Sequence, residues 1–296
     1  MTGAPASPRG PLLMMLATLC FTVMVGAVKV ARAELSALEV IVWRTAISAP
    51  LALSLCRKTG IGVRAWRVLA LRVALGTGAM FCFFTAAKGL AMADLSILSR
   101  LQPIAVALLA PLTLGAVERS SPRVRFALGA GLAGSALIVG PELRVGNVYG
   151  LWALAATLLS AGAHVAVRSL GSTDDPRVVV FWFQVGACTL AFTAHGTLTG
   201  SAIALPPLHL WGTLAAVGLF ATLGQVAMTF AYKAAPAARV AAASYTAPLF
   251  GLAGDLLFFD GWPSPLALLG GLLVTAAGLS LVWRRQNGPS ASRETP

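Results

Sequence analysis

Ten apolar segments of about 20 residues follow one another along this chain, separated by short polar loops. A helix needs about 20 mainly apolar residues to cross a lipid bilayer. With 57% hydrophobic and only 11% charged residues, the chain has more apolar side chains than a water-soluble fold can bury. The sequence therefore predicts an all-α membrane protein with ten transmembrane helices in a lipid bilayer. The segments lie at about 11–31, 37–56, 68–88, 94–115, 123–141, 148–168, 177–199, 209–231, 238–258 and 264–283.

The basic residues indicate how the chain is oriented. If the N-terminus is cytoplasmic, 16 Lys and Arg residues, Arg72 among them, fall at the inner ends of the segments and four at the outer ends. Because membrane insertion keeps Lys and Arg on the cytoplasmic side, this bias predicts a multi-pass inner-membrane protein with both termini in the cytoplasm. The same bias accounts for the net charge of +12, so no nucleic-acid partner is expected.

Two stretches of the chain carry the same pattern, residues 88–103 and 233–248. Each runs from a lysine to a proline over the same distance, which places Arg100 opposite Tyr245. The stretches open the fourth and ninth segments, so each copy of the unit contains five. Because five is odd, the two copies would lie upside down relative to each other, as in many secondary transporters. The sequence therefore predicts a 5+5 inverted-topology repeat.

The repeat also bears on the N-terminus and the domain boundaries. Thr18 in the first segment aligns with Thr157 in the sixth, and Trp43 with Trp182 in the segments that follow. We therefore interpret the first segment as a retained span, although its basic start and Ala-Arg-Ala ending also resemble a signal peptide. The predicted parts are a cytoplasmic tail (1–10), two five-helix repeats (11–141 and 148–284) and a disordered cytoplasmic tail (286–296).

Two arginines, Arg44 and Arg100, lie inside predicted helices. A charge there costs at least about 2.5–3.5 kcal/mol, so it usually faces protein or water rather than lipid. Our hypothesis is that one or both attract a carboxylate or another anionic group of a substrate. Alternatively they brace the structure: Arg44 could pair with Glu39 or Asp94, or extend its charge to the membrane surface.

Polar side chains at helical spacing mark several helix faces. In the sixth segment Thr157, Ser160, His164 and Arg168 share one face, where His164 could also relay protons. Such faces suit a small-molecule cavity, although each of these side chains could instead be a hydrogen-bonded packing residue between helices. The candidate cavity residues are Trp43, Arg44, Phe84, Arg100, Gln102, His164, Trp182, Gln225 and Tyr245.

Prolines and small residues indicate how the helices bend and pack. Pro103 and Pro248 occupy matching positions in the two halves, so they are candidate hinges or, alternatively, static kinks. Small residues four apart in the fifth and tenth segments allow close helix contact. That contact could lie within the chain or in a homodimer.

Motifs for catalysis and nucleotide use are missing from the sequence. There is no GxxxxGK[ST], HExxH or GxSxG motif, no pair of carboxylates at catalytic spacing, and no metal-binding spacing among the four cysteines. We therefore expect no metal, no cofactor and no enzymatic activity. The alternative is a membrane-embedded enzyme or a sensor that uses the same central cavity.

Three stretches resemble EamA-type carriers of the drug/metabolite transporter superfamily, residues 88–90, 98–118 and 231–260. The resemblance covers about 11–284 and rests on the order and duplication of the motifs. It implies a central cavity lined by the first four helices of each half, with the fifth and tenth helices outside. It also implies a secondary transporter that moves a small amino-acid-like, carboxylated or amphipathic metabolite by alternating access, in many relatives outward. Family membership does not identify the substrate.

Overall fold

The computed structural model describes residues 8–89, 98–139, 148–250, 253 and 265–282. Every regular element in these ranges is a helix. Six helices are long and apolar enough to cross a membrane, which makes the chain a multi-pass membrane protein. They are α1 (Arg9–Ala31), α2 (Ala37–Leu55), α3 (Trp66–Gly89), α7 (Val148–Leu170), α8 (Pro176–Thr199) and α9 (Trp211–Ala234).

Shorter helices occupy the remaining predicted segments. The α-helices are α5 (Gln102–Leu114), α6 (Pro122–Val139), α10 (Ala237–Ala243) and α12 (Pro265–Val282), and the 3-10 turns are η1 (Ala116–Glu118), η2 (Leu208–Leu210) and η3 (Ser244–Thr246). Each of the ten predicted segments therefore contains at least one helix. The fourth and ninth segments extend into residues outside the described ranges, so ten complete spans are not established.

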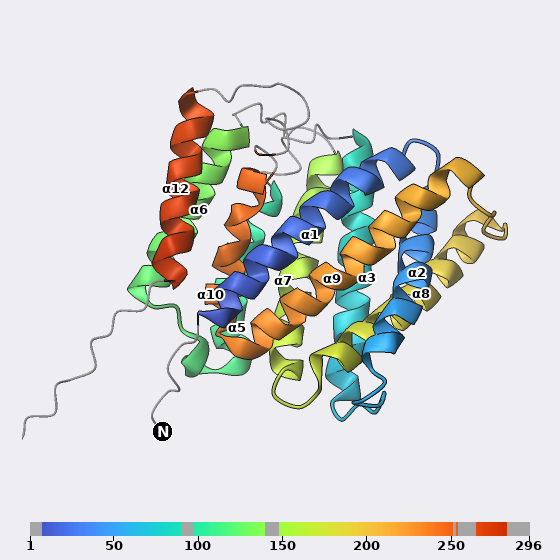
Figure 1. The fold of residues 1–296 in the computed structure, drawn as a ribbon, viewed down its shortest axis with the longest axis horizontal. Helices are drawn as coiled ribbons and strands as arrows, with labels where there is room; N and C mark the ends of the chain where they lie inside the picture. Colours follow the sequence, from blue (N-terminus) through green and yellow to red (C-terminus); the bar gives the residue numbers. More distant parts are fainter. Residues whose placement is uncertain (1–7, 90–97, 140–147, 251–252, 254–264, 283–296) are drawn as a thin grey trace, which may run out of the picture.

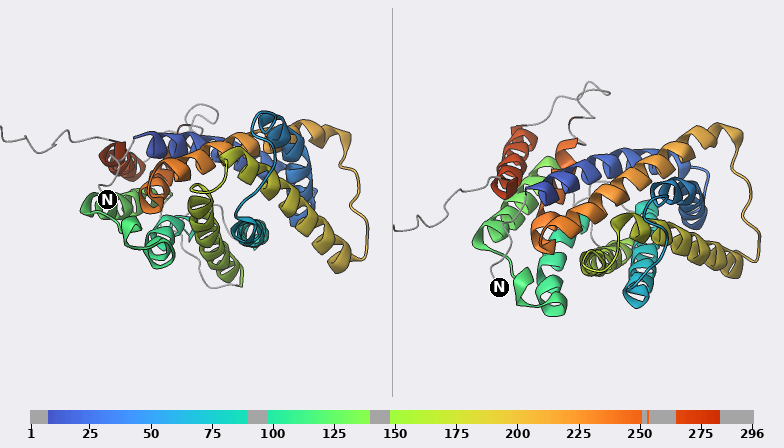
Figure 2. Two further views of the ribbon diagram at one scale, coloured as in Figure 1. Left: turned by 90° about the horizontal axis from the view of Figure 1, so that it is seen from below. Right: turned by 60° about the horizontal axis from the view of Figure 1, so that its bottom comes forward.

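The long helices pack in pairs that join distant parts of the sequence. α1 lies along α9, α3 along α7, and α2 along α8 (Figure 1). α6 and α12 form another pair at one side of the molecule, far from α2 and α8 (Figure 1, Figure 2). The cavity described below is lined by the α2/α8 side and by the helices between the two sides, and not by α6 or α12.

Glycines set how closely two of these pairs approach. A Cβ added at Gly224 on α9 would lie 2.7 Å from the ring of Phe21 on α1. A Cβ added at Gly134 on α6 would lie 2.7 Å from the backbone oxygen of Gly270 on α12. Since small residues let helix backbones approach, Gly134 allows close contact between α6 and α12 inside the chain. The glycines of the predicted four-residue spacing face other residues: Gly131 faces Tyr245, and Gly271 faces Leu249.

The two matched prolines follow breaks in the helices. Arg100 and Leu101 form a turn, and Pro103 lies in the first turn of α5. In the ninth segment α10 ends at Ala243, and the 3-10 turn η3 separates it from Pro248. A proline at the start of a helix breaks no internal hydrogen bond, because that N–H would have no helical partner. The predicted kink at Pro103 is therefore a break that precedes the proline.

Candidate functional site

A cavity of about 800 Å³ lies among α1, α2, α3, α7, α8 and α9 and the residues just before α5 and after α10. Its volume falls within the range of small-molecule sites. None of its lining residues comes from α6 or α12. The polar and charged lining residues are Thr18, Thr22, Lys29, Arg44, Arg72, Ser99, Arg100, Gln102, Thr157, Ser160, His164, Gln225 and Ser244.

The cavity lies inside the helix bundle, several residues away from most helix termini. We call the end where α1 begins and where α7 and α9 end the Glu118 end, and the opposite end the Lys29 end. The lining residues nearest the Glu118 end on α1, α3, α7 and α9 are Met14, Arg72, His164 and Met228. Each lies five or six residues from its helix terminus, or about 8–9 Å along the axis. At the Lys29 end the helices differ. The lining reaches Lys29, two residues from the end of α1, but stops at Phe84, five residues from the end of α3, and at Ala156, eight residues from the start of α7.

Arg44 projects from α2 and is only 2% exposed. Its Nη1 donates to the sulfur of Met80 on α3 at 2.7 Å, and its Nε has no hydrogen-bond partner among the described residues. Glu39, one of the predicted partners, is used elsewhere. Its carboxylate accepts the backbone N–H of Ser36 at 2.7 Å in the capping box that begins α2. Asp94, the other predicted partner, lies outside the described residues.

Arg72 on α3 is a cavity residue that sequence reasoning missed. It is 3% exposed rather than at the membrane surface. Its Nη2 donates to Gln225 Oε1 on α9 at 3.1 Å, and its guanidinium stacks 3.9 Å from the ring centre of Phe183 on α8. A Cβ at Gly76, one helical turn further on, would overlap the guanidinium. The four-residue spacing of Arg72 and Gly76 is the sequence signal that could have identified this site.

Arg100 lies where the two matched stretches meet. The hydroxyl of Tyr245 donates to the backbone oxygen of Arg100 at 2.9 Å, and Arg100 Nη1 donates to the backbone oxygen of Ser244 at 3.2 Å. The Nε of Arg100 is buried and has no hydrogen-bond partner in the part of the chain that the structure describes. These bonds hold the turn before α5 against the turn after α10, so Arg100 reaches the cavity from a fixed backbone.

His164 on α7 makes a short hydrogen bond through Nδ1 with Gln102 Nε2 of α5. Its ring centre is 5.3 Å from that of Tyr232 on α9. Thr157, on the same face of α7, donates to the backbone oxygen of Leu98 at 3.2 Å. The predicted polar face of α7 therefore lines the cavity along most of its length and ties α7 to the start of α5.

Three predicted cavity residues lie outside the lining. Trp43 packs edge to face on Trp211, with ring centres 5.4 Å apart, and the indole of Trp182 donates to the backbone oxygen of Ile61 at 2.8 Å. Tyr245 is not a lining residue and instead donates its hydroxyl hydrogen bond to the backbone of Arg100, which does line the cavity. The residues that the structure brings together around the cavity are Arg44, Phe84, Arg100, Gln102, His164 and Gln225.

The lining charges favour anions. Four of the described lining residues are Lys or Arg, and none is Asp or Glu. Across the described chain no group of three or more His, Cys, Asp or Glu side chains could hold a metal ion. The arrangement can therefore attract an anionic group by charge and bind polar groups through Ser, Thr, Gln and His side chains.

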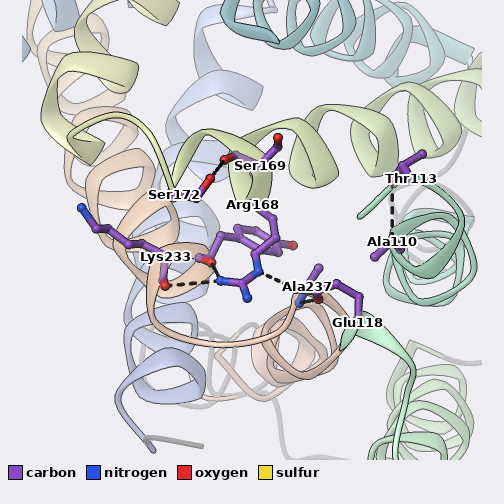
Figure 3. A network of polar contacts seen from close by, with 9 residues as sticks. Ala110, Thr113, Glu118, Arg168, Ser169, Ser172, Lys233 and Ala237 are labelled. Carbon is purple, nitrogen blue, oxygen red and sulfur yellow. Dashed lines mark hydrogen bonds and ion pairs between the residues drawn. The ribbon is translucent and has the colours of Figure 1, made fainter. Parts of the chain in front are cut away.

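A polar network joins the helices at the Glu118 end, outside the cavity (Figure 3). Glu118 Oε1 accepts a hydrogen bond from Arg168 Nε at 2.7 Å, and Glu118 Oε2 accepts the backbone N–H of Ala237 at 2.7 Å. Arg168 Nη1 also donates to the backbone oxygens of Tyr232 (2.9 Å) and Lys233 (3.3 Å). The network joins η1, α7, α9 and α10, and the Glu118 side chain is only 2% exposed. Sequence reasoning did not assign a role to Glu118.

The fold and cavity are those of a membrane carrier, and comparison with known proteins agrees. The model of the EamA-like transporter family matches two stretches of the chain, residues 8–140 and 148–283. The chain belongs to the EamA-like transporter family.

Among similar proteins, the pseudopaline exporter CntI of Pseudomonas aeruginosa (strain UCBPP-PA14) is 33% identical over 276 residues, covering 92% of this chain and 95% of the exporter. An uncharacterized transporter of Helicobacter pylori (strain J99) is 29% identical over 287 residues, covering 91% and 93% of the two chains. One solved crystal structure of another protein has a TM-score of 0.79 with this chain at 18% sequence identity. The match covers 92% of this chain and 96% of the other chain. This last likeness concerns the fold alone.

Proposed function

We propose that this protein is a secondary transporter that exports a small carboxylated or amphipathic metabolite across the inner membrane by alternating access. The observation that carries the proposal is the position of the cavity. It is cationic, lies deep among apolar helices, stops about 8–9 Å short of the Glu118 end, and comes near the opposite end only along α1, at Lys29. The similarity to a named exporter supports outward movement.

We also propose that the two family matches form a 5+5 inverted repeat. The packing of α1 on α9 then has its counterpart in the packing of α7 on α3. Thr18 and Thr157, which align between the halves, both line the cavity. Arg100 and Tyr245, which also align, contact each other. These relations are those expected when two related halves face each other across a central site.

The Glu118 end is assigned to the cytoplasm, together with both termini. Arg9, Arg168 and Lys233 lie at this end, and the excess of Lys and Arg remains when Arg72 is left out of the count. Since Lys and Arg favour the cytoplasmic side, the Lys29 end faces outward. In the described conformation the Glu118 network then lies on the cytoplasmic side of the cavity.

In this scheme the transporter alternates between two arrangements of the same helices. Loading from the cytoplasm requires the Glu118 network to open, and release follows when it closes again. Pro103 and Pro248 are proposed hinges, because a helix break precedes each of them. Arg44, Arg100, Gln102, His164 and Gln225 are proposed substrate contacts, with Phe84 as part of the apolar wall.

Flux measurements test the proposal. Purified protein in proteoliposomes is given a panel of labelled metabolites, and uptake and counterflow are measured against protein-free liposomes. We expect saturable flux for at least one carboxylated compound. Chemical turnover of a compound without flux would instead support a membrane-embedded enzyme. Reporter fusions at residues 171–175 and at the termini test the orientation, since all should report the cytoplasm.

A further inference from the structure

The cavity contains more positive charge than one carboxylate needs. Arg44, Arg72 and Arg100 line it together with Lys29, and no acidic side chain is among the described lining residues. Among the described residues, the Arg168–Glu118 ion pair and the His209–Glu34 hydrogen bond both lie elsewhere. The three arginines are therefore held in the protein by neutral groups only, as far as the described residues show.

Arg44 and Arg72 form a pair of buried cations from neighbouring helices. They are 2% and 3% exposed, and Arg44 lies against Met80 while Arg72 lies against Gly76, one helical turn away on α3. Their described partners are a sulfur, an amide oxygen and an aromatic ring, and the Nε of each has no partner. Like charges repel more strongly when water is excluded, so an anion bound between them would relieve both the repulsion and the burial cost.

Arg100 supplies a further cation from a different part of the molecule. It precedes α5, whereas the other two arginines lie on α2 and α3, and its hydrogen bonds run to Ser244 and Tyr245 near α10. Its Nε is also buried without a partner. The guanidinium fork matches a carboxylate in two parallel hydrogen bonds, so each location can bind one such group.

We propose that the transported compound carries at least two carboxylates, one bound by Arg44 and Arg72 and another by Arg100. This inference rests on the proposed transport function and narrows its substrate class. Phe83 and Phe84 supply apolar surface for the carbon skeleton between the charges, and Lys29 near the outer end attracts the anion as it enters or leaves. Compounds with a single carboxylate, and zwitterions such as glutamine, satisfy only part of this charge.

Binding to the purified full-length chain tests the number of carboxylates. Isothermal titration at constant ionic strength compares butyrate, glutarate and tricarballylate, which carry one, two and three carboxylates, with glutamine as the zwitterion. We expect glutarate and tricarballylate to bind at least about tenfold more tightly than butyrate and glutamine. Equal affinities across the panel, or no binding of either polycarboxylate, would overturn the proposal. Binding of pyrophosphate without binding of either polycarboxylate would overturn the assignment to carboxylates.

Variants then test the arginines. We expect Arg72→Gln to weaken tricarballylate binding by at least about tenfold, while Arg72→Lys, which keeps the charge but not the planar fork, should weaken it less than Arg72→Gln. Arg125→Gln is the matched control, because Arg125 is exposed on α6 and outside the cavity. Monodisperse elution in size-exclusion chromatography establishes that each variant is folded. Unchanged binding in a folded Arg72→Gln variant contradicts the proposal.

Flux separates this inference from the proposed function. If glutamine or butyrate shows saturable flux in proteoliposomes and the polycarboxylates show none, the protein is a transporter and the polycarboxylate assignment is wrong. If no compound of a broad metabolite panel shows flux, transport itself fails. Flux of glutarate or tricarballylate that falls in Arg72→Gln supports both.

Discussion

Glu118→Gln should loosen the Glu118 end of the molecule. In the described conformation the carboxylate joins Arg168 and the N–H of Ala237, each at 2.7 Å. The substitution keeps the size of the side chain and one acceptor oxygen but removes the charge. Arg168 then loses its anionic partner, while its bonds to the two backbone oxygens of α9 remain.

The magnitude follows from burial. Breaking a fully buried ion pair costs about 3–5 kcal/mol, and an exposed pair contributes about 0–1 kcal/mol. The Glu118 side chain is 2% exposed and the Arg168 side chain 25%, and Gln keeps part of the hydrogen bonding, so we estimate about 2 kcal/mol. A change of this size shifts the ratio of the two conformations by about 30-fold.

Site-directed labelling measures this shift. The four native cysteines, Cys20, Cys56, Cys82 and Cys188, are replaced, and a single cysteine is placed at Met228 near the cavity floor. An impermeant maleimide is then added from either face of oriented vesicles. We expect the labelling rate from the Glu118 side to rise by about 30-fold in Glu118→Gln, provided that opening is in rapid equilibrium.

Two comparisons make the result specific. Glu34→Gln removes the carboxylate that contacts His209 at the Lys29 end, where both side chains are well exposed, and should leave labelling unchanged. Arg168→Gln should act in the same direction as Glu118→Gln, and the double variant should show less than the sum of the two effects. Equal rates in wild type and folded Glu118→Gln would refute the role of this network.

Three further predictions concern packing, support and pH. Gly131→Ala should destabilise the protein by about 1–3 kcal/mol in chemical unfolding, because the new Cβ would lie 2.5–3.0 Å from carbons of Tyr245, whereas Gly129→Ala, with nothing within 4 Å, should be neutral or stabilising. Tyr245→Phe removes the hydrogen bond to Arg100 and should lower stability by about 1 kcal/mol and raise the KM for flux; an unchanged KM means that this support is not needed for binding. Burial alone would raise the pKa of Asp174, but hydrogen bonds from neighbouring side-chain and backbone donors and the charge of Arg64 outweigh it and lower the pKa. The stabilisation by this carboxylate is therefore present above its unfolded pKa, near 4, and is lost as the pH falls through the lower folded value, so acid should lower the thermal midpoint of wild type more than that of Asp174→Asn.

Particular elements show how far the sequence could be interpreted. The long uniform apolar runs predicted α1, α2, α3, α7, α8 and α9, since a span of that length requires little beyond local composition. The break before Pro103 was not predicted, because proline excludes one hydrogen bond but does not say whether the helix bends or stops. The polar face of α7 was predicted from its spacing, and its Thr157 and His164 do line the cavity.

The charged residues show where sequence reasoning failed. Arg72 lies near the end of an apolar run, where a membrane-surface arginine is the ordinary expectation. Its side chain is directed toward the cavity only because it packs against Phe183 and Gln225 and because Gly76 leaves space for it. Glu118 likewise follows a helix as an ordinary loop acid, and its buried bond to Arg168 joins residues 50 positions apart.

The sequence by itself determined that this protein lies in a lipid bilayer, where its apolar helices are, and to which family the chain belongs. Those properties follow from composition and order along the chain, which do not depend on which helices touch. Only the tertiary structure decided which polar residues share the cavity, which of them join the helices at the Glu118 end, and which hold the lining residues in place. Those choices depend on the rotation of each helix and on contacts between residues far apart in sequence, where a shift of one residue along a helix turns a side chain by about 100°.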